Sequence, residues 1–272
     1  MHQPSTRKQS VPGRRTGAVR RADIPAHVLA ALNAGTLESA TLAEGLAVDY
    51  AALLAAAVPD MAPACISEMA AAADLGITRR MNLAAKLLLS HGGTALLPML
   101  SGHASDTVRG FACFVIGLAS DLAATDRLNA MRPFADDPHF GVREWAWMAV
   151  RPHVARDLGA WMTMLEPLVH EQSERLRRFA IEITRPRGVW CAHLAELRHD
   201  PAKGLALLVP VRNDPAKYVQ DSVGNWLNDA AKDHPEFVRD LCAVWEREGD
   251  SPANRRIRSR ALRSIKGKGG DG

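Results

Sequence analysis

The sequence contains few aromatic residues, few cysteines and no long β-branched runs. Aromatic side chains make up 5% of its 272 residues, whereas Ala and Leu dominate an apolar fraction of 47%. Because Ala and Leu favour helices, the composition predicts an all-α protein rather than a sheet-based one. This length and apolar content allow one large domain, or two small ones, with a sizeable core.

The four cysteines are widely spaced and include no Cys-x-x-Cys pair. A disulfide framework or a zinc site is therefore not expected, and a reducing cytosol fits this usage. The chain has no run of about 18 apolar residues, so we expect no transmembrane helix and no membrane partner. The N-terminus also lacks the apolar segment of a secretory signal, which favours a cytoplasmic protein.

Basic residues are concentrated at the two ends of the chain. Residues 1–21 carry six basic side chains and no acid, and residues 251–272 carry seven against a single acid, Asp271. Basic ends on a mildly acidic middle suggest a polyanionic partner, although such tails can also be merely solvated. We predict a disordered basic tail over residues 1–21, a single repeat domain over 22–265 and a flexible Gly/Lys tail over 266–272.

Five short segments share one pattern, with an apolar first and fifth position. Their starts are separated by 34, 34, 43 and 38 residues, and each follows a turn-like segment. A helix pair that repeats at roughly 35 to 45 residues is typical of HEAT-class solenoids. We therefore predict a right-handed α-solenoid of HEAT-like repeats with a concave binding face. The segments are Val108–Ala112, Val142–Ala146, Leu176–Ala180, Val219–Val223 and Ile257–Ala261.

The third position of the unit, and the positions one and two turns further along, change chemistry from repeat to repeat. Because the second helices of neighbouring repeats stack side by side, these positions should line one continuous surface. The arginines at the second position should instead be structural and pair with neighbouring repeats. We expect the surface to gather Glu144, Arg178, Glu182, Asp221, Asn225 and Asp229, and the structural set to be Arg109, Arg143 and Arg177.

Residues 218–235 are predicted as one helix that Pro235 ends. Its acids could bind a metal, remain a solvated face or stabilise a cation. The metal option is weak because the ten histidines form no His-x-x-x-His or His-x-His pair. Tryptophan beside carboxylates suits a flat cation, and nearby arginines suit phosphates. Together they describe an alkylated base in DNA, whereas core packing is the preferred interpretation for Trp147, Trp161 and Trp245.

The residues also carry a resemblance that extends over nearly everything from about residue 20 onward. Four segments resemble the AlkC branch of the AlkC/AlkD DNA alkylation-repair glycosylases. They are Leu32–Asp49, Phe140–Ala146, Arg177–Arg187 followed by Trp190, and Tyr218–Pro235. The Arg-Pro-Arg and Asn-Asp-Ala-Ala-Lys-Asp motifs are fairly specific, whereas HEAT repeats alone would not be.

The resemblance implies a monofunctional glycosylase that excises N3- or N7-alkylated purines, such as 3-methyladenine, from duplex DNA. It also implies base excision repair of alkylation damage by a cofactor-free monomer that acts on the bacterial nucleoid. Carboxylates and a tryptophan surround the lesion in that family, and an arginine contacts the DNA backbone. By motif, the catalytic positions are Glu182, Asp229, Trp190 and Glu144, and the predicted DNA contacts are Arg178, Arg185, Arg187, Asn225, Trp226 and Arg143.

Elementary chemistry agrees with this assignment. Alkylation at N3 or N7 makes the base cationic and a good leaving group, and the sugar then develops oxocarbenium character that Glu182 and Asp229 could stabilise. The main alternative is a non-catalytic HEAT-repeat module that binds nucleic acid or a protein. A glycosylase for bulky adducts is a second alternative, and a metal-dependent hydrolase is a more distant one.

Overall fold

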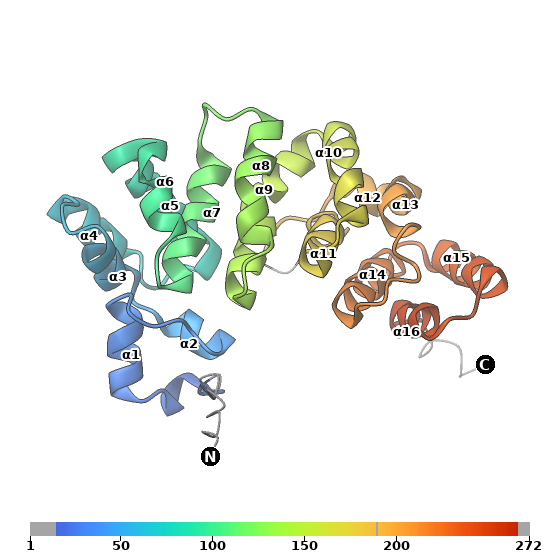
Figure 1. Ribbon diagram of the computed structural model, residues 1–272, viewed down its shortest axis with the longest axis horizontal. Helices are drawn as coiled ribbons and strands as arrows, with labels where there is room; N and C mark the ends of the chain where they lie inside the picture. Colours follow the sequence, from blue (N-terminus) through green and yellow to red (C-terminus); the bar gives the residue numbers. More distant parts are fainter. Residues whose placement is uncertain (1–14, 189, 266–272) are drawn as a thin grey trace, which may run out of the picture.

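The computed structural model describes residues 15–188 and 190–265, and within these ranges it contains helices and no strand. The helices follow one another along an arc, with α1 near one end of it and α16 near the other (Figure 1). The all-α solenoid expected from the repeats is therefore confirmed. Residues 1–14 of the tail predicted over 1–21, and the whole tail predicted over 266–272, lie outside the described residues.

The first part of the arc precedes the repeats found in the sequence. It comprises a 3-10 turn η1 (Arg21–Asp23), α1 (Ala26–Asn33), α2 (Leu42–Ala47), α3 (Tyr50–Ala57), α4 (Pro63–Ala71), α5 (Ile77–Gly92), η2 (Gly93–Leu96) and α6 (Leu97–Ser101). The second part comprises α7 (Asp106–Leu118), α8 (Ala124–Ala135), α9 (Phe140–Arg156), α10 (Leu158–Leu165), η3 (Glu166–His170), α11 (Glu174–Ile183), α12 (Ala195–His199), η4 (Pro201–Gly204), α13 (Leu205–Leu208), α14 (Lys217–Ala230), α15 (Pro235–Glu248) and α16 (Pro252–Ala261).

The five repeat segments fall on α7, α9, α11, α14 and α16, and each of these helices packs against the next. We call them the inner row, because α10, α12, α13 and α15 lie outside them in the arc (Figure 1). The first and fifth position of every segment is buried, as the pattern predicted. One apolar stripe per helix thus forms the continuous core between repeats.

The second-position arginines form a repeated contact between the turn and the helix of each unit. Arg109, Arg143 and Arg177 each donate from Nη1 to the carbonyl oxygen six residues earlier, at 2.8 to 2.9 Å. Arg109 also pairs with Asp137 at 2.9 Å and Arg177 with Asp214 at 2.6 Å, in the turn of the following inner-row helix. The structural interpretation of these arginines is confirmed, and for Arg143 it competes with the predicted contact to DNA.

The helix predicted over residues 218–235 is shorter than expected. α14 ends at Ala230, and Pro235 starts α15 instead of ending α14. Proline is tolerated in the first turn of a helix, where its missing N–H has no intrahelical partner in any case. The turn between the two helices is closed by the backbone N–H of His234, which donates to Ala230 O at 2.8 Å.

One stretch, Ile77–Ser101, has the length and hydropathy of a membrane-spanning helix. Composition alone does not distinguish such a span from a core helix. In the structure the stretch is interrupted at Gly93, which has a φ of 61°, and continues as η2 and α6. Met81, Ala84 and Leu88 of α5 are fully buried in the core, and α5 packs on α7.

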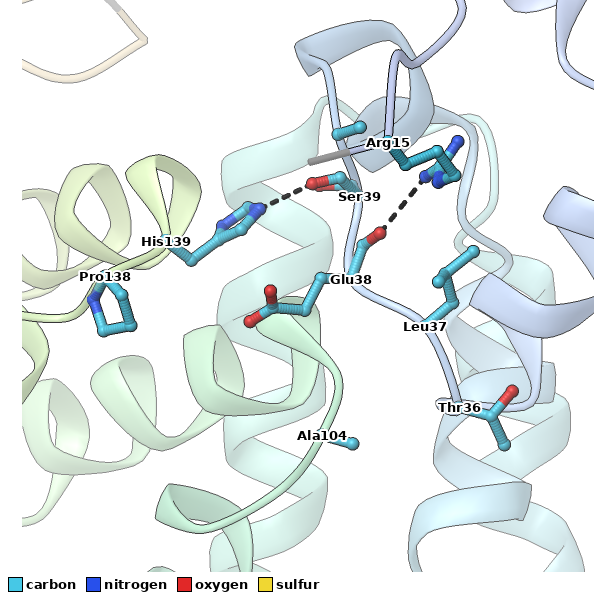
Figure 2. A pocket seen from close by; sticks show the side chains of 9 residues that line it. Arg15, Thr36, Leu37, Glu38, Ser39, Ala104, Pro138 and His139 are labelled. Carbon is cyan, nitrogen blue, oxygen red and sulfur yellow. Dashed lines mark hydrogen bonds between the residues drawn. The ribbon is translucent and has the colours of Figure 1, made fainter. Parts of the chain in front are cut away.

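Residues 15–18, which belong to the predicted tail, contact the folded domain through Glu44. Arg15 donates to both oxygens of this buried carboxylate, at 2.7 and 2.5 Å, and the backbone N–H of Ala18 donates at 3.0 Å. The hydrogen bond from Arg15 is the largest cause that lowers the pKa of Glu44 to about 2, against the opposing effect of burial. Arg15 also donates to Glu38 O at 3.3 Å (Figure 2), and the Thr41 hydroxyl donates to Ala18 O, so Glu44 fixes the start of the described chain together with these two contacts.

We expect Glu44→Gln to lower the free energy of unfolding at neutral pH, with an effect that fades in acid. Because the folded pKa is depressed, the carboxylate stabilises the fold above the ordinary pKa of 4.5 and loses this contribution as the pH falls toward 2. Thermal unfolding of both proteins across this pH range measures the difference. Glu196→Gln, in an exposed pair with Lys203, is the control with little effect. A gap that stayed constant down to the lowest pH would contradict this role.

Candidate functional site

Three carboxylates from three consecutive inner-row helices meet in one network with two arginines. Glu144 comes from α9, Glu182 from α11 and Asp229 from the last turn of α14. Glu182 and Asp229 are buried, with 3% of each residue exposed, whereas the Glu144 side chain is about one third exposed. We call this set, with Arg178 and Arg185, the carboxylate–arginine network.

Arg178 joins the first two carboxylates. Its Nη2 donates to Glu144 Oε1 at 2.7 Å and lies 3.7 Å from Glu182 Oε1. The guanidinium is stacked on the ring of Tyr218, with its carbon 4.4 Å from the ring centroid. The other oxygen of Glu144 accepts from Trp147 Nε1 at 2.8 Å. Stacking and ion pairing together hold Arg178 in one orientation.

Arg185 joins the second and third carboxylates, just after the end of α11. Its Nη1 donates to Glu182 Oε2 at 3.2 Å, and its Nε and Nη2 lie 2.9 and 2.7 Å from Asp229 Oδ2. Lys232 approaches the other oxygen of Asp229 at 3.2 Å. Each buried carboxylate is therefore neutralised by a cation, as burial of a charge requires.

The face of α14 that meets the network differs from the expected one. Tyr218, Ser222, Asn225 and Asp229 follow a four-three-four spacing, which places them on a single helical face. Ser222 Oγ donates to Glu182 Oε1 at 2.7 Å, so this face contributes hydrogen bonds as well as charge. Asp221 was expected here but pairs with Arg256 and Arg260 of α16, at 2.7 and 2.9 Å.

The protonation states follow from these contacts. Burial alone would raise the pKa of Glu182, but the charges of Arg178 and Arg185 and the Ser222 hydroxyl outweigh it and lower the pKa. Burial likewise opposes the charge of both arginines, yet the neighbouring carboxylates raise their pKa values. Glu182 is therefore ionised at neutral pH and presents negative charge, not a proton.

Trp190 lies in the loop between α11 and α12, residues 184–194, of which residue 189 is outside the described residues. It has a left-handed φ of 61° and is 48% exposed, whereas Trp147, Trp161 and Trp245 are buried as predicted. Its carbonyl oxygen accepts from Thr78 Oγ1 of α5 at 3.2 Å. The loop thus carries an exposed aromatic ring across to a distant helix.

Arg151 of α9, which the sequence did not single out, holds both ends of this loop. The side chain is buried and donates to the carbonyl oxygens of Ile183, Arg185 and Ala192 at 2.9, 2.6 and 3.0 Å. Three bonds from one planar group fix the exit from α11, and with it the position of Arg185. Arg151 and Ser222 are thus supporting residues that motif comparison did not reveal.

The prediction that Trp226 contacts DNA is wrong for this structure. The ring is fully buried, and its Nε1 donates to Thr184 O at 2.9 Å. A Cβ at Gly204 would lie 2.3 Å from the ring, so α14 and η4 are in close contact at this point. Trp226 faces the core because it sits one position after Asn225, which belongs to the polar face.

The arginines predicted to contact DNA are all already paired within the protein. Arg187 Nη2 lies 2.5 Å from Asp233, whose pKa is lowered to about 2, chiefly by a hydrogen bond from Arg198. Arg143 Nε donates to Tyr218 OH at 3.0 Å, which links it to the ring under Arg178. Over residues 15–188 and 190–265, no group of three or more His, Cys, Asp or Glu side chains is arranged to hold a metal ion.

The stacked helices of the inner row make the fold a HEAT-like α-solenoid of the AlkC/AlkD type. The chain is similar to the solved structure of Pseudomonas fluorescens alkylpurine DNA glycosylase AlkC bound to DNA containing an abasic site analog. The TM-score is 0.64 at 26% identity, over 79% of this chain and 61% of that chain. The resemblance seen in the sequence motifs is confirmed at the level of the fold.

A curated relative adds a shorter match. The uncharacterized protein YhaZ of Bacillus subtilis (strain 168) is 34% identical over 121 residues, which is 44% of this chain and 33% of YhaZ. The chain therefore matches about a third of YhaZ and less than two thirds of the AlkC chain. No family model matches the sequence.

Proposed function

We propose that the protein is a DNA glycosylase that hydrolyses the N-glycosidic bond of cationic N3- or N7-alkylated purines in duplex DNA. The observation that carries the proposal is the carboxylate–arginine network, in which Glu144, Glu182 and Asp229 meet from three consecutive helices. The structural similarity to a glycosylase bound to DNA gives this network its context. Double-stranded DNA that contains such lesions is the proposed partner.

In this mechanism the ionised carboxylates stabilise the positive charge that develops on the deoxyribose as the cationic base leaves. The three carboxylates of the network face its two arginines and the neighbouring Lys232, so the charges balance without DNA. When a DNA phosphate accepts the hydrogen bonds of one of these arginines, the carboxylate that the arginine leaves is free to face the sugar. Exchange of ion-pair partners would thus couple DNA binding to charge at the reacting centre.

Trp190 has the exposure that a lesion contact requires, and it lies on the loop that follows α11, the helix that carries Glu182. We assign its ring to pack against the lesion or its deoxyribose, where a flat cation gains from the aromatic face. Arg178 and Arg185 bind phosphates after they leave their carboxylate partners. Asn225 shares the face of Asp229 and is partly exposed, and we assign it to contact the DNA strand.

The test is release of free 3-methyladenine and 7-methylguanine from methylated duplex DNA by the full chain, with EDTA present. Excision above the rate of spontaneous depurination, with an abasic strand as the other product, supports a metal-free glycosylase. Heat-unfolded protein serves as the control. Binding to the same duplex without any release of base would remove the catalytic proposal.

We expect Arg178→Ala to weaken DNA binding in a salt-dependent way. If Arg178 binds one phosphate, its loss reduces the slope of log affinity against log salt by about 0.9. Fluorescence anisotropy with a labelled duplex over a series of salt concentrations measures this slope. Arg132→Ala is the matched control, because Arg132 pairs with Glu171 and lies on α8, outside the inner row. An unchanged slope for Arg178→Ala would mean that the residue has only a structural role.

A non-catalytic HEAT-repeat module that binds nucleic acid or a protein is the second candidate. One observation favours it: every carboxylate of the network is already neutralised by a cation in this structure. In that case the network holds adjacent repeats together, and its carboxylates are dispensable for everything except stability. The base-release assay distinguishes the two candidates directly.

A further inference from the structure

A small basic pocket lies at the N-terminal end of the arc and shares no residue with the carboxylate–arginine network. It has a volume of about 170 Å³ and lies where η1, the α2–α3 junction, α4 and α5 meet. Its polar lining consists of Arg21, Asp49, Tyr50 and Arg80, and the rest is apolar. This volume is well below the roughly 300 Å³ or more of sites that hold drug-sized ligands, so the pocket suits a small group.

Arg80 is the reason to regard this pocket as a site. Its guanidinium carbon lies 4.7 Å from the centroid of the Tyr50 ring, so one face of the group is covered. Its Nε is buried and has no hydrogen-bond partner. Among the described residues, Arg80 forms no side-chain ion pair either. Arg80 is only partly buried, and its terminal nitrogens make no hydrogen bond to a described residue. They are therefore available to an acceptor in the pocket, which a charged donor held close to apolar groups favours.

The other polar groups of the pocket leave a net positive charge. Arg21 also makes no side-chain hydrogen bond or ion pair with a described residue. Asp49 is the single acid in the lining, and its Oδ1 is used to accept from the backbone N–H groups of Ala51 and Ala52 at the start of α3. The pocket is therefore lined by two guanidinium groups and by one carboxylate that already caps a helix.

We propose that this pocket binds an oxyanion of the phosphate class, held by Arg80 stacked on Tyr50 and by Arg21. A planar guanidinium matches two oxygens of such a group with two parallel hydrogen bonds. The aromatic ring fixes the plane of Arg80 beforehand, so little side-chain freedom is lost on binding. The phosphate can come from a free inorganic anion or from a DNA backbone, and the two sources are separable by experiment.

The first experiment measures binding of inorganic phosphate to the full chain by isothermal titration and by the rise in unfolding temperature. We expect Arg80→Met to lose at least tenfold in phosphate affinity. Lys86→Met is the matched control, because it removes one positive charge from an exposed position of the same helix. Arg80→Met removes a donor that has no partner but also the cation stacked on Tyr50, so the unfolding temperature without phosphate is measured for both variants to confirm that each is folded.

The second experiment repeats the DNA-binding titration over a series of salt concentrations with the same variants. A slope reduced by about 0.9 for Arg80→Met beyond that of Lys86→Met, with competition by phosphate, identifies a DNA phosphate as the occupant. Phosphate binding that Arg80→Met abolishes, with an unchanged DNA slope, identifies a free anion. Equal behaviour of the two variants in both experiments overturns the proposal. None of these outcomes depends on base release, so the site and the proposed glycosylase activity fail separately.

Discussion

Glu182→Gln and Asp229→Asn are expected to lower the rate of base excision by roughly 10²- to 10³-fold each, the effect of removing one charge-stabilising group from a reacting centre. The substitutions keep the size and one hydrogen-bonding oxygen of each side chain but remove its charge. Single-turnover release of 3-methyladenine from saturating protein isolates the chemical step from DNA affinity. Full activity of either carboxamide variant would contradict charge stabilisation by that residue.

These variants should also lose stability, because each leaves Arg185 with one buried partner fewer. Removal of one member of a buried ion pair costs up to about 3–5 kcal/mol, although the retained oxygen keeps part of the interaction. Asp221→Asn is the matched control on the same helix. Its carboxylate pairs with Arg256 and Arg260 outside the network, so excision should be unchanged. Circular dichroism at the assay temperature confirms that each variant is folded.

Trp226→Ala is expected to destabilise the protein by about 3–5 kcal/mol, the cost of removing a large aromatic side chain from a packed core. The ring is fully buried between α14 and η4, and its N–H bonds Thr184 O. Urea unfolding measures the loss. Trp226→Phe keeps most of the volume and should cost about 1–2 kcal/mol, because it leaves a carbonyl oxygen unpaired. DNA affinity of the folded Phe variant should equal that of the wild type.

Trp190→Ala should have the opposite effects to a substitution of Trp226, with little loss of stability and a clear loss of excision. Because the Trp190 ring is half exposed, its removal should change stability by no more than about 1 kcal/mol. Excision should nevertheless fall, since the ring is assigned to the lesion. If Trp226→Phe weakened DNA binding while Trp190→Ala left excision intact, the two tryptophans would have been assigned the wrong way round.

The solenoid was predictable from sequence because its signal repeats. Val108, Val142 and Val219 occupy equivalent positions and are all fully buried. Once the repeats are aligned, the same positions therefore predict the core residues of several helices. The end of α14 was not predictable from Pro235, because proline fits the start of a helix as well as it ends one. Only the turn at His234 decides between the two, and that turn depends on tertiary packing.

The candidate site was predictable where helical spacing determines it. Glu182 and Asp229 were identified by motif, and Arg178 lies one turn before Glu182 on the same face. The sequence predicted that the face of α14 toward the site contains Asp221, whereas the structure has the next residue, Ser222, on that face. Both choices give a polar stripe along the helix, so the spacing alone did not distinguish them. Arg151 left no local signal, because its three acceptors are backbone carbonyl oxygens that any sequence supplies.

The 184–194 loop changes how this solenoid can unfold. In an array of repeats each unit contacts only its neighbours, so the ends can open one unit at a time. Here Trp190 O is bonded to Thr78 of α5, although α7 and α9 lie between α5 and α11 in the chain of packed helices. Opening α5 therefore also releases the loop after α11. Amides at the start of α5 and in the loop after α11 should therefore exchange with solvent together, whereas contacts between neighbouring repeats alone would let them open independently.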